Sequence, residues 1–290
     1  MKMNKALSAL AAFCCYAMVS VAQTTGKTAT VIKAEEDFNK LAARKGLKDA
    51  FLAVADPEGL IFKPEPVKIT EFYGNIDKQP GTLTWQPKFA RISAGGDLAV
   101  TTGPYVYTTG KAGDDKVYGD YVSVWRNGAD NKLKLLFNLG IQHPEGDTQP
   151  LIDVKEPDAS KAKSTVKDPF KAKSIILNTD KTLNATLHKS ALVGYKAFCS
   201  PEAHYYFPGF PAITGQDQIM KFVSSQGINI AAETLDAGRA ISNDLAYSYG
   251  RARIQKGNIV SNYNYVRVWE LDDQNHWNVL VEIYSAIENE

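Results

Sequence analysis

Residues 119–126 read Gly-Asp-Tyr-Val-Ser-Val-Trp-Arg, and residues 263–270 read Tyr-Asn-Tyr-Val-Arg-Val-Trp-Glu, so one pattern occurs twice at an offset of 144 residues. Two other segments repeat at the same offset. Asp-Pro-Glu at 56–58 corresponds to Ser-Pro-Glu at 200–202, and Asn-Lys-Leu at 131–133 corresponds to Asn-His-Trp at 275–277. Chance matches would scatter in their offsets, whereas internal repeats share one period. The sequence therefore predicts a tandem duplication.

Each copy begins with a helical pattern. Apolar residues recur at helical spacing over 38–54 and over 183–198, with an interruption at Lys45-Gly46 in the first copy. The proline that follows ends each helix, because the residue before proline is pushed out of the helical region. Strands are predicted next, at 60–62 and 205–207. A further short helix is predicted at 214–223 only in the second copy, since Pro64 and Pro66 break the corresponding stretch of the first.

The rest of each copy has the pattern of long strands joined by turns, for example at 97–107, 117–126 and 132–142. Helices followed by an antiparallel sheet indicate an α+β fold. Between the copies, residues 144–171 are polar and proline-containing and show no period, as is typical of a linker. The predicted organisation is a first domain at 30–143, a linker at 144–171 and a second domain at 172–290.

The N-terminus has the pattern of a secretory signal peptide at residues 1–22. Lys2 and Lys5 precede an apolar run over 6–19, and Ser-Val-Ala at 20–22 is typical of a cleavage site. The run is shorter than the roughly 20 residues that a membrane-spanning helix needs. Phe13 before Cys14 argues against a lipoprotein signal. We expect a periplasmic or secreted protein with no membrane anchor after the signal is removed.

Composition and motifs exclude several classes of function. The 290 residues include 33 Lys+Arg and 32 Asp+Glu, and this balance indicates no nucleic-acid partner. Cys199 is the cysteine that remains after signal removal, so we expect a small buried residue and no internal disulfide. The four histidines are dispersed, which argues against a metal site. Phosphate-loop, dinucleotide-binding and nucleophile-elbow motifs are missing, so no cofactor is predicted.

These residues resemble the nuclear transport factor 2-like superfamily, which includes SnoaL-like cyclases and ketosteroid isomerases. The resemblance covers both copies. It rests on the helix ending in Asp-Pro-Glu-Gly at 56–59, the helix at 215–222, the Tyr-Val-x-Val-Trp strand and the turn into Trp277. The first copy departs from the pattern at the short helix and at Leu133, which stands in place of Trp277. The resemblance implies two cone-shaped domains, each with N-terminal helices packed on a curved antiparallel sheet.

The repeated strand also predicts how the copies meet. Side chains alternate between the two faces of a strand, so aromatic residues share one face and valines the other. Members of the resembled superfamily commonly pair through their sheets, which implies an intramolecular pseudo-dimer of the two domains. The residues predicted at the interdomain seam are Tyr121, Trp125, Tyr265 and Trp269, with the valines toward each core. The alternative is aromatic cross-strand packing inside each sheet.

Glu282 is the predicted catalytic residue. It stands between Leu280 and Tyr284 on the closing strand, where it either reaches solvent or lies in a cavity that raises its pKa and suits it to proton transfer. The first copy has Asn138 at this position, which cannot act as a base. His188 is the predicted partner, and the alternative for it is a packing residue on the long helix.

A ligand pocket is predicted in the second domain, because arginine can pair with a carboxylate and tyrosine supplies rings and hydroxyls. The alternative is an exposed strand with solvated arginines. The predicted ligand-binding residues are Tyr206, Tyr247, Tyr249, Arg251 and Tyr284.

Three functions remain open from the sequence. The first is an exported protein that binds a small organic ligand in its second domain, with a mainly structural first domain. The second is a SnoaL-like isomerase, cyclase or dehydratase with Glu282 as general base, and with His188 or Tyr206 as its partner. The third is a protein-interaction module that uses the sheet faces. A cavity in the second domain with Glu282 on its wall would favour the first two functions over the third.

Overall fold

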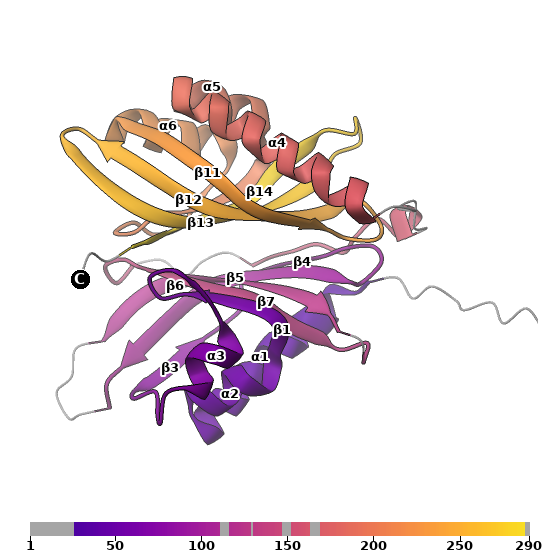
Figure 1. The fold of residues 1–290 in the computed structure, drawn as a ribbon, viewed down its shortest axis with the longest axis vertical. Helices are drawn as coiled ribbons and strands as arrows, with labels where there is room; N and C mark the ends of the chain where they lie inside the picture. Colours follow the sequence, from indigo (N-terminus) through magenta and orange to yellow (C-terminus); the bar gives the residue numbers. More distant parts are fainter. Residues whose placement is uncertain (1–25, 111–115, 129, 147–151, 163–168, 288–290) are drawn as a thin grey trace, which may run out of the picture.

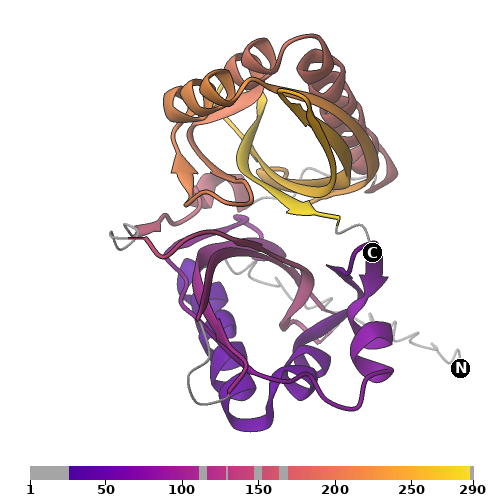
Figure 2. The ribbon, with the colours of Figure 1, turned by 90° about the vertical axis from the view of Figure 1, so that its left-hand side faces the viewer.

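The computed structural model describes residues 26–110, 116–128, 130–146, 152–162 and 169–287. The predicted signal peptide, residues 1–22, lies outside these residues. The described residues form two domains of similar construction, stacked one above the other in Figure 1. Each has helices on its outer side and a strongly curved sheet on its inner side (Figure 2). The predicted α+β class with two cone-shaped domains is confirmed.

The first domain begins with a helical pair and continues with a sheet in the order β2-β1-β7-β6-β5-β4, in which β3 also pairs with β5. Strands β1 and β7 run parallel, and the neighbouring hairpins are antiparallel. Its elements are α1 (Thr28–Lys45), α2 (Leu47–Val54), β1 (Ala55–Phe62), β2 (Pro66–Lys68), α3 (Ile69–Gly74), β3 (Thr82–Trp85), β4 (Phe89–Ile92), β5 (Leu98–Thr108), β6 (Val117–Asn127) and β7 (Leu133–Gln142).

Gly46 divides the first two helices, as the interruption in the sequence predicts. Its φ is 88°, a left-handed value that glycine adopts without steric cost. The inward stripe of α1 includes Val31, Glu35 and Phe38, spaced by about one helical turn, and all three are buried. Glu35 thus carries a carboxyl group into the interior of the first domain.

The second domain repeats this arrangement with longer strands, and its sheet order is β10-β9-β14-β13-β12-β11. Strand β14 runs parallel to β9, just as β7 runs parallel to β1. Its elements are α4 (Pro169–Lys189), α5 (Ala191–Phe198), β9 (Cys199–Tyr206), β10 (Ile213–Thr214), α6 (Gln216–Gln226), β11 (Ile228–Arg239), β12 (Leu245–Lys256), β13 (Ile259–Leu271) and β14 (Trp277–Ala286).

Two regions differ from the sequence prediction. The segment predicted as an irregular linker contains β8 (Asp153–Val154), which pairs with β4, and a 3-10 turn η1 (Ala159–Ala162). The first copy also has its short helix, α3, because Pro64 and Pro66 only delay its start. Ile69 and Tyr73, four residues apart, are both buried and hold α3 against the core.

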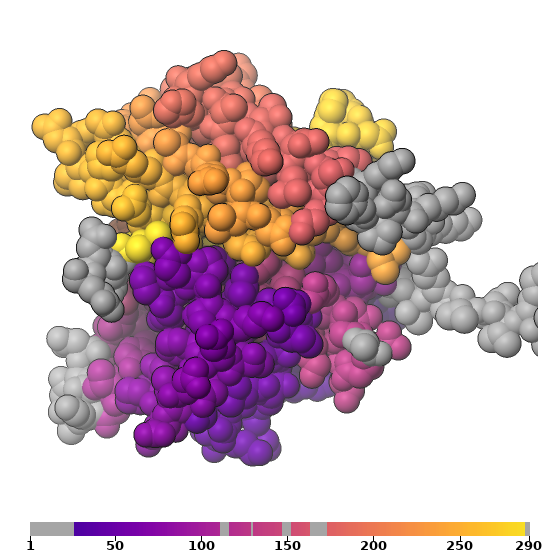
Figure 3. All heavy atoms as spheres, in the orientation of Figure 1, coloured from indigo at the N-terminus to yellow at the C-terminus, as the bar shows by residue number. Residues whose placement is uncertain are grey.

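The two sheets pack face to face in the middle of the molecule, with the helices on the outside (Figure 1). Aliphatic side chains and a few aromatic rings fill this interdomain seam, and in the space-filling view the two halves meet along a continuous contact (Figure 3). The seam residues from β6, β7, β13 and β14 include Val122, Val124, Phe137, Leu139, Val266, Val268, Val281 and Ile283. The two copies therefore form a pair within one chain.

Hydrogen bonds across the seam are reciprocal. Asp97 Oδ2 accepts from the backbone N–H of Ile241 at 2.8 Å, and Asp244 Oδ2 accepts from the backbone N–H of Ala94 at 2.7 Å. The two domains thus use the same turn against each other, as the two subunits of an isologous dimer do.

The predicted positions of the aromatic residues are wrong. Tyr121 and Trp125 pack inside the first cone, Tyr265 and Trp269 pack inside the second, and the valines face the seam. The predicted alternation is confirmed, but the aromatic face points into each cone and the valine face points to the seam. Large rings fill the deep concave side of a curved sheet, whereas compact β-branched side chains allow two sheets to pack about 10 Å apart.

Candidate functional site

A buried carboxylate lies inside the first cone. Glu35 is fully buried and accepts four hydrogen bonds, from Trp85 Nε1 at 2.6 Å, Trp125 Nε1 at 2.9 Å, Thr101 Oγ1 at 2.5 Å and Ser123 Oγ at 3.4 Å. No cation contacts it in the part of the chain that the structure describes. Burial raises the pKa of Glu35 above its usual range, and the four hydrogen bonds offset only part of this effect.

Asp180 on α4 is the matching carboxylate of the second cone. It accepts hydrogen bonds from Tyr265 Oη at 2.6 Å and Ser248 Oγ at 2.9 Å, and Arg267 Nη1 lies 2.7 Å from its Oδ1. Arg267 is itself fully buried, and its Nε lies 2.5 Å from Glu282 Oε1. The interior of the second cone thus holds a guanidinium group between two carboxylates.

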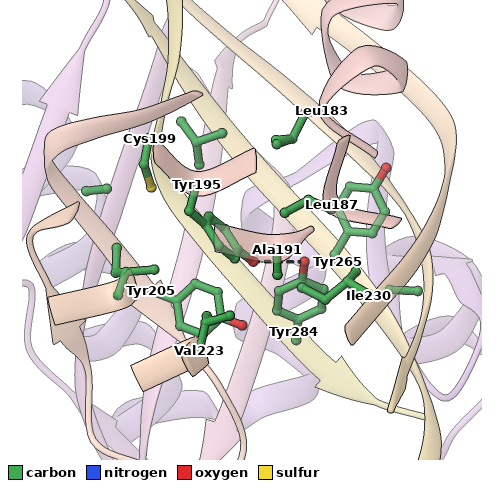
Figure 4. Close-up of a cluster of buried hydrophobic side chains, with 14 of the residues drawn as sticks. Leu183, Leu187, Ala191, Tyr195, Cys199, Tyr205, Val223, Ile230, Tyr265 and Tyr284 are labelled. Carbon is green, nitrogen blue, oxygen red and sulfur yellow. Dashed lines mark hydrogen bonds between the residues drawn. The ribbon is translucent and has the colours of Figure 1, made fainter. Parts of the chain in front are cut away.

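Tyrosine rings complete this interior. Tyr284 donates from Oη to Glu282 Oε1 at 2.8 Å, and Tyr195 Oη lies 3.5 Å from Tyr284 Oη. Figure 4 shows Tyr195 and Tyr284 pointing toward each other with Tyr205 beside them, whereas the hydroxyl of Tyr265 points away from this group; Leu183 and Leu187 of α4 lie nearby. All four tyrosines are 1 % exposed or less. The interior of this cone is therefore occupied by the protein's own side chains.

The first cone, by contrast, contains a cavity of about 700 Å³. Aromatic rings make up much of its wall, from α1, α2, α3 and the strands of the sheet. The aromatic residues on the wall are Phe38, Phe51, Phe62, Tyr73, Trp85, Tyr105, Tyr107 and Tyr121, and the polar side chains there include Asn138, Gln79 and Gln142.

Three substitutions between the copies account for this cavity. Gly140 pairs with Tyr121 in the first sheet, where Tyr284 pairs with Tyr265 in the second. By the same strand register Asn138 corresponds to Glu282, and Ser123 to Arg267. The side chains that fill the second cone are therefore smaller or missing in the first, and the sheet is too rigidly paired to close over the space.

Two polar groups on the cavity wall have unused hydrogen-bonding capacity. Tyr121 is 5 % exposed, and its Oη has no hydrogen-bond partner among the described residues. Burial, followed by the nearby Glu35 carboxylate, raises the pKa of Tyr121 well above its usual range, so the hydroxyl stays protonated. Asn138 donates from Nδ2 to Ser123 Oγ at 3.1 Å, which leaves its Oδ1 as an acceptor. A bound molecule would meet this amide oxygen, whereas Tyr121 Oη is itself buried.

The second domain contributes to the wall of this cavity. Pro208, Ser285 and Ala286 line it together with Lys63 and Pro64 of the first domain. Asn264 of β13 donates a hydrogen bond to the carbonyl oxygen of Pro64, which ties the two domains together nearby. The site therefore uses residues of both copies.

No protein-family model matches this sequence, and no curated protein matches it. Solved structures do match in fold. A nuclear transport factor 2-like protein from Cytophaga hutchinsonii is 20 % identical over 39 % of this chain and 97 % of its own, with a TM-score of 0.34. A ketosteroid isomerase-like protein from Erwinia carotovora atroseptica is 14 % identical over 43 % of this chain and 100 % of its own, with a TM-score of 0.36.

An LEH-like epoxide hydrolase from Mycobacterium tuberculosis is 13 % identical over 41 % of this chain and 83 % of its own, with a TM-score of 0.32. Each match spans less than half of this chain and most of the other protein. At this level of identity the likeness concerns the fold alone.

The predicted catalytic pair does not assemble in the second cone. Glu282 is 1 % exposed and ion-paired with Arg267, and it does not line the cavity of the first cone. His188 is exposed on α4 and has no contact with Glu282. A base of this kind must reach a substrate proton, so the geometry contradicts these two roles. The sequence revealed the odd carboxylate but not its partner, because Arg267 lies on another strand.

The predicted ligand-binding residues lie in different parts of the molecule. Tyr284 lies inside the second cone, whereas Tyr206, Tyr247 and Tyr249 pack in the seam, and Tyr206 Oη lies 2.5 Å from Thr102 Oγ1 of the first domain. Arg251 is about half exposed and pairs with Glu65 of the first domain at 2.5 Å. The predicted pocket in the second domain is therefore not built by these residues.

A second, more open hollow lies between the domains, beside β9. Two Asp–His contacts face it: His143 Nε2 lies 3.2 Å from Asp120 Oδ2, and His204 Nε2 lies 3.2 Å from Asp153 Oδ2. Burial lowers the pKa of His204, although Asp153 opposes this. Burial likewise raises the pKa of Asp120. Mixed charges line this hollow, and they select no single class of ligand.

The described residues contain neither a metal-binding cluster nor a membrane-spanning helix. No group of three or more His, Cys, Asp or Glu side chains there is placed to hold a metal ion. No helix there is both long and apolar enough to cross a membrane. Cys199 is buried, as predicted, and burial raises the pKa of its thiol.

Proposed function

We propose that this protein binds a small organic molecule in the cavity of its first domain. The observation that carries the proposal is the cavity of about 700 Å³, with aromatic walls and the free amide oxygen of Asn138, at the place where the second copy is filled. Binding sites for small molecules have volumes of about 300–1,000 Å³ and combine apolar walls with a few polar groups. The second domain then has the mainly structural role, the reverse of the sequence prediction.

The other two functions have less support. Catalysis by Glu282 needs an open path to a substrate, and Arg267 and Tyr284 occupy the space around this carboxylate. Protein interaction through the sheet faces needs those faces to be free, and in this chain they cover each other.

A fluorescence titration with the neutral probe N-phenyl-1-naphthylamine tests the proposal. The wild-type protein should enhance the probe's emission with saturation. Gly140→Tyr places the second-copy side chain in the cavity and should weaken binding by at least about tenfold, since a tyrosine ring displaces the probe. Gly140→Ala adds a single methyl group and should bind almost as the wild type does. Equal binding by the folded Gly140→Tyr variant, checked by circular dichroism, would refute a site in the first cone.

Export is part of the proposal. The pattern of residues 1–22 supports cleavage after Ala22 and release into the periplasm or the medium. Expression of the full chain in a bacterial host should yield a processed form that begins at Gln23, measured by intact mass and N-terminal sequencing. A full-length protein retained in the cytoplasm would contradict this.

A further inference from the structure

The second cone contains a cationic side chain of its own, Arg267. The Arg267 guanidinium is fully buried, and its central carbon lies 4.3 Å from the ring centroid of Tyr265. Asp180 and Glu282 balance its charge at 2.7 Å and 2.5 Å. This interior therefore shows which groups hold a cation inside such a cone: a tyrosine face, a carboxylate on the first long helix and an oxygen acceptor on the last strand.

The first cone keeps these groups but lacks the cation. Tyr121 occupies the place of Tyr265, and Glu35 on α1 supplies the buried carboxylate. Asn138 replaces Glu282 and still offers an amide oxygen. Ser123 stands where Arg267 would be, so no charged group enters the space. The result is a cavity whose surroundings match a positive charge that the chain itself does not provide.

The aromatic wall of the cavity supports the same interpretation. Cations are attracted to the faces of tryptophan and tyrosine rings, and enclosure by several rings is a known way to recognise ammonium groups. Trp85 lines the cavity and donates to Glu35, so the carboxylate lies at the Nε1 edge of this indole, in the plane of the ring. Lys63 is the cationic side chain on the wall, and it is exposed to solvent, where water screens its charge.

We propose that the molecule bound in the first cone is an organic cation, an ammonium or guanidinium group on an apolar body, whose charge lies against Tyr121 and Trp85 within the field of Glu35. This inference rests on the proposed small-molecule site and specifies its ligand class. A neutral molecule of the same shape fits the walls but leaves Glu35 without a counter-charge.

A pair of isosteres tests the proposal. The probes are (4-hydroxyphenyl)trimethylammonium and 4-tert-butylphenol, which have nearly the same shape and differ in charge. Their dissociation constants are measured by calorimetric titration at pH 7 and low salt. We expect the cation to bind about tenfold more tightly. Glu35→Gln should remove most of that preference while binding of 4-tert-butylphenol changes little. Glu36→Gln makes the same change of charge on the exposed side of α1 and should leave the preference intact.

The pH dependence of binding by the wild-type protein is a second test, and it does not require any variant to fold. The preference for the cation should decline as the pH falls and Glu35 takes up a proton, within a range above the usual carboxyl value. The other ionisable groups on the described part of the wall are Lys63 and four tyrosines, and burial raises the pKa of Tyr73, Tyr105 and Tyr121 further above the carboxyl range.

The outcomes separate the two proposals. Equal binding of both isosteres at every pH, with loss of both in Gly140→Tyr, would overturn the cation assignment and leave the binding site in place. Binding of either isostere that Gly140→Tyr does not affect would overturn the proposed site itself, and the inference with it.

Discussion

The two cones of this chain have the same arrangement of helices and strands, but the interior of the second is filled and the interior of the first contains a cavity. In the second, Arg267 joins Asp180 and Glu282 in a buried ion-paired network that leaves the space filled. In the first, Ser123, Asn138 and Gly140 stand at the matching positions, and a cavity remains above a lone carboxylate. The comparison shows that a filled and a hollow cone differ at three matching positions on two neighbouring strands.

The largest expected effect comes from removing the cation of the second cone. Arg267→Met leaves Asp180 and Glu282 buried without a counter-charge, and breaking such a network costs about 3–5 kcal/mol in the free energy of unfolding. Urea denaturation followed by tryptophan fluorescence measures it. Arg253→Met, at an exposed arginine of β12, is the control and should cost less than about 0.5 kcal/mol. Similar losses in the two variants would show that the network does not stabilise the second cone.

A second test makes the same substitution in both cones. Tyr265→Phe removes a donor to Asp180 at 2.6 Å and should cost about 1.5–3 kcal/mol, the range for hydrogen bonds to charged groups. Tyr121→Phe removes a hydroxyl without a partner and should change the free energy of unfolding by less than about 0.5 kcal/mol. Each variant is the control of the other. A reversed order of the two losses would contradict the assignment of Tyr121 as the uncommitted group.

The smallest expected effect is the pH dependence of stability caused by Glu35. Its pKa is raised in the folded state, so the folded protein holds this proton more tightly than the unfolded chain. The stabilisation is complete below the unfolded value of 4.5 and is lost as the pH rises through the folded pKa. Relative to Glu35→Gln, wild-type stability should therefore fall by up to about 1.4 kcal/mol per pH unit in this window. A wild-type stability that rises with pH relative to Glu35→Gln would be inconsistent with burial as the dominant cause.

Much of the fold could be predicted from the sequence. The 144-residue offset, the breaks at Gly46 and before proline, and the strand alternation are local signals, and they predict the N-terminal helices and the long strands but not α3. The face of each strand could not be assigned from alternation alone. Tyr121 and Val122 alternate in either orientation, and only the curvature of the assembled sheet decides which side is deep enough for rings.

The site was harder to predict, because it depends on partners far apart in the sequence. Glu282 stood out as a charge among apolar residues, but its neutralisation by Arg267 on β13 and Asp180 on α4 is a tertiary feature. Glu35 was missed because it lies in a charged stretch of α1, where a surface position is the usual expectation. The signal that was available is Gly140 opposite Tyr121, a small residue on a closing strand where the second copy has a large one.

The contribution of Pro208, Ser285 and Ala286 to the cavity of the first domain has a consequence for how this duplication could diverge. In a symmetric homodimer every substitution appears on both sides, so a residue cannot be optimised as a wall for one pocket and as a filling for the other. Covalent linkage removes that restriction. In a single chain, the second domain can have a filled interior while the first keeps its cavity. Neither domain expressed alone would have the complete wall of this cavity.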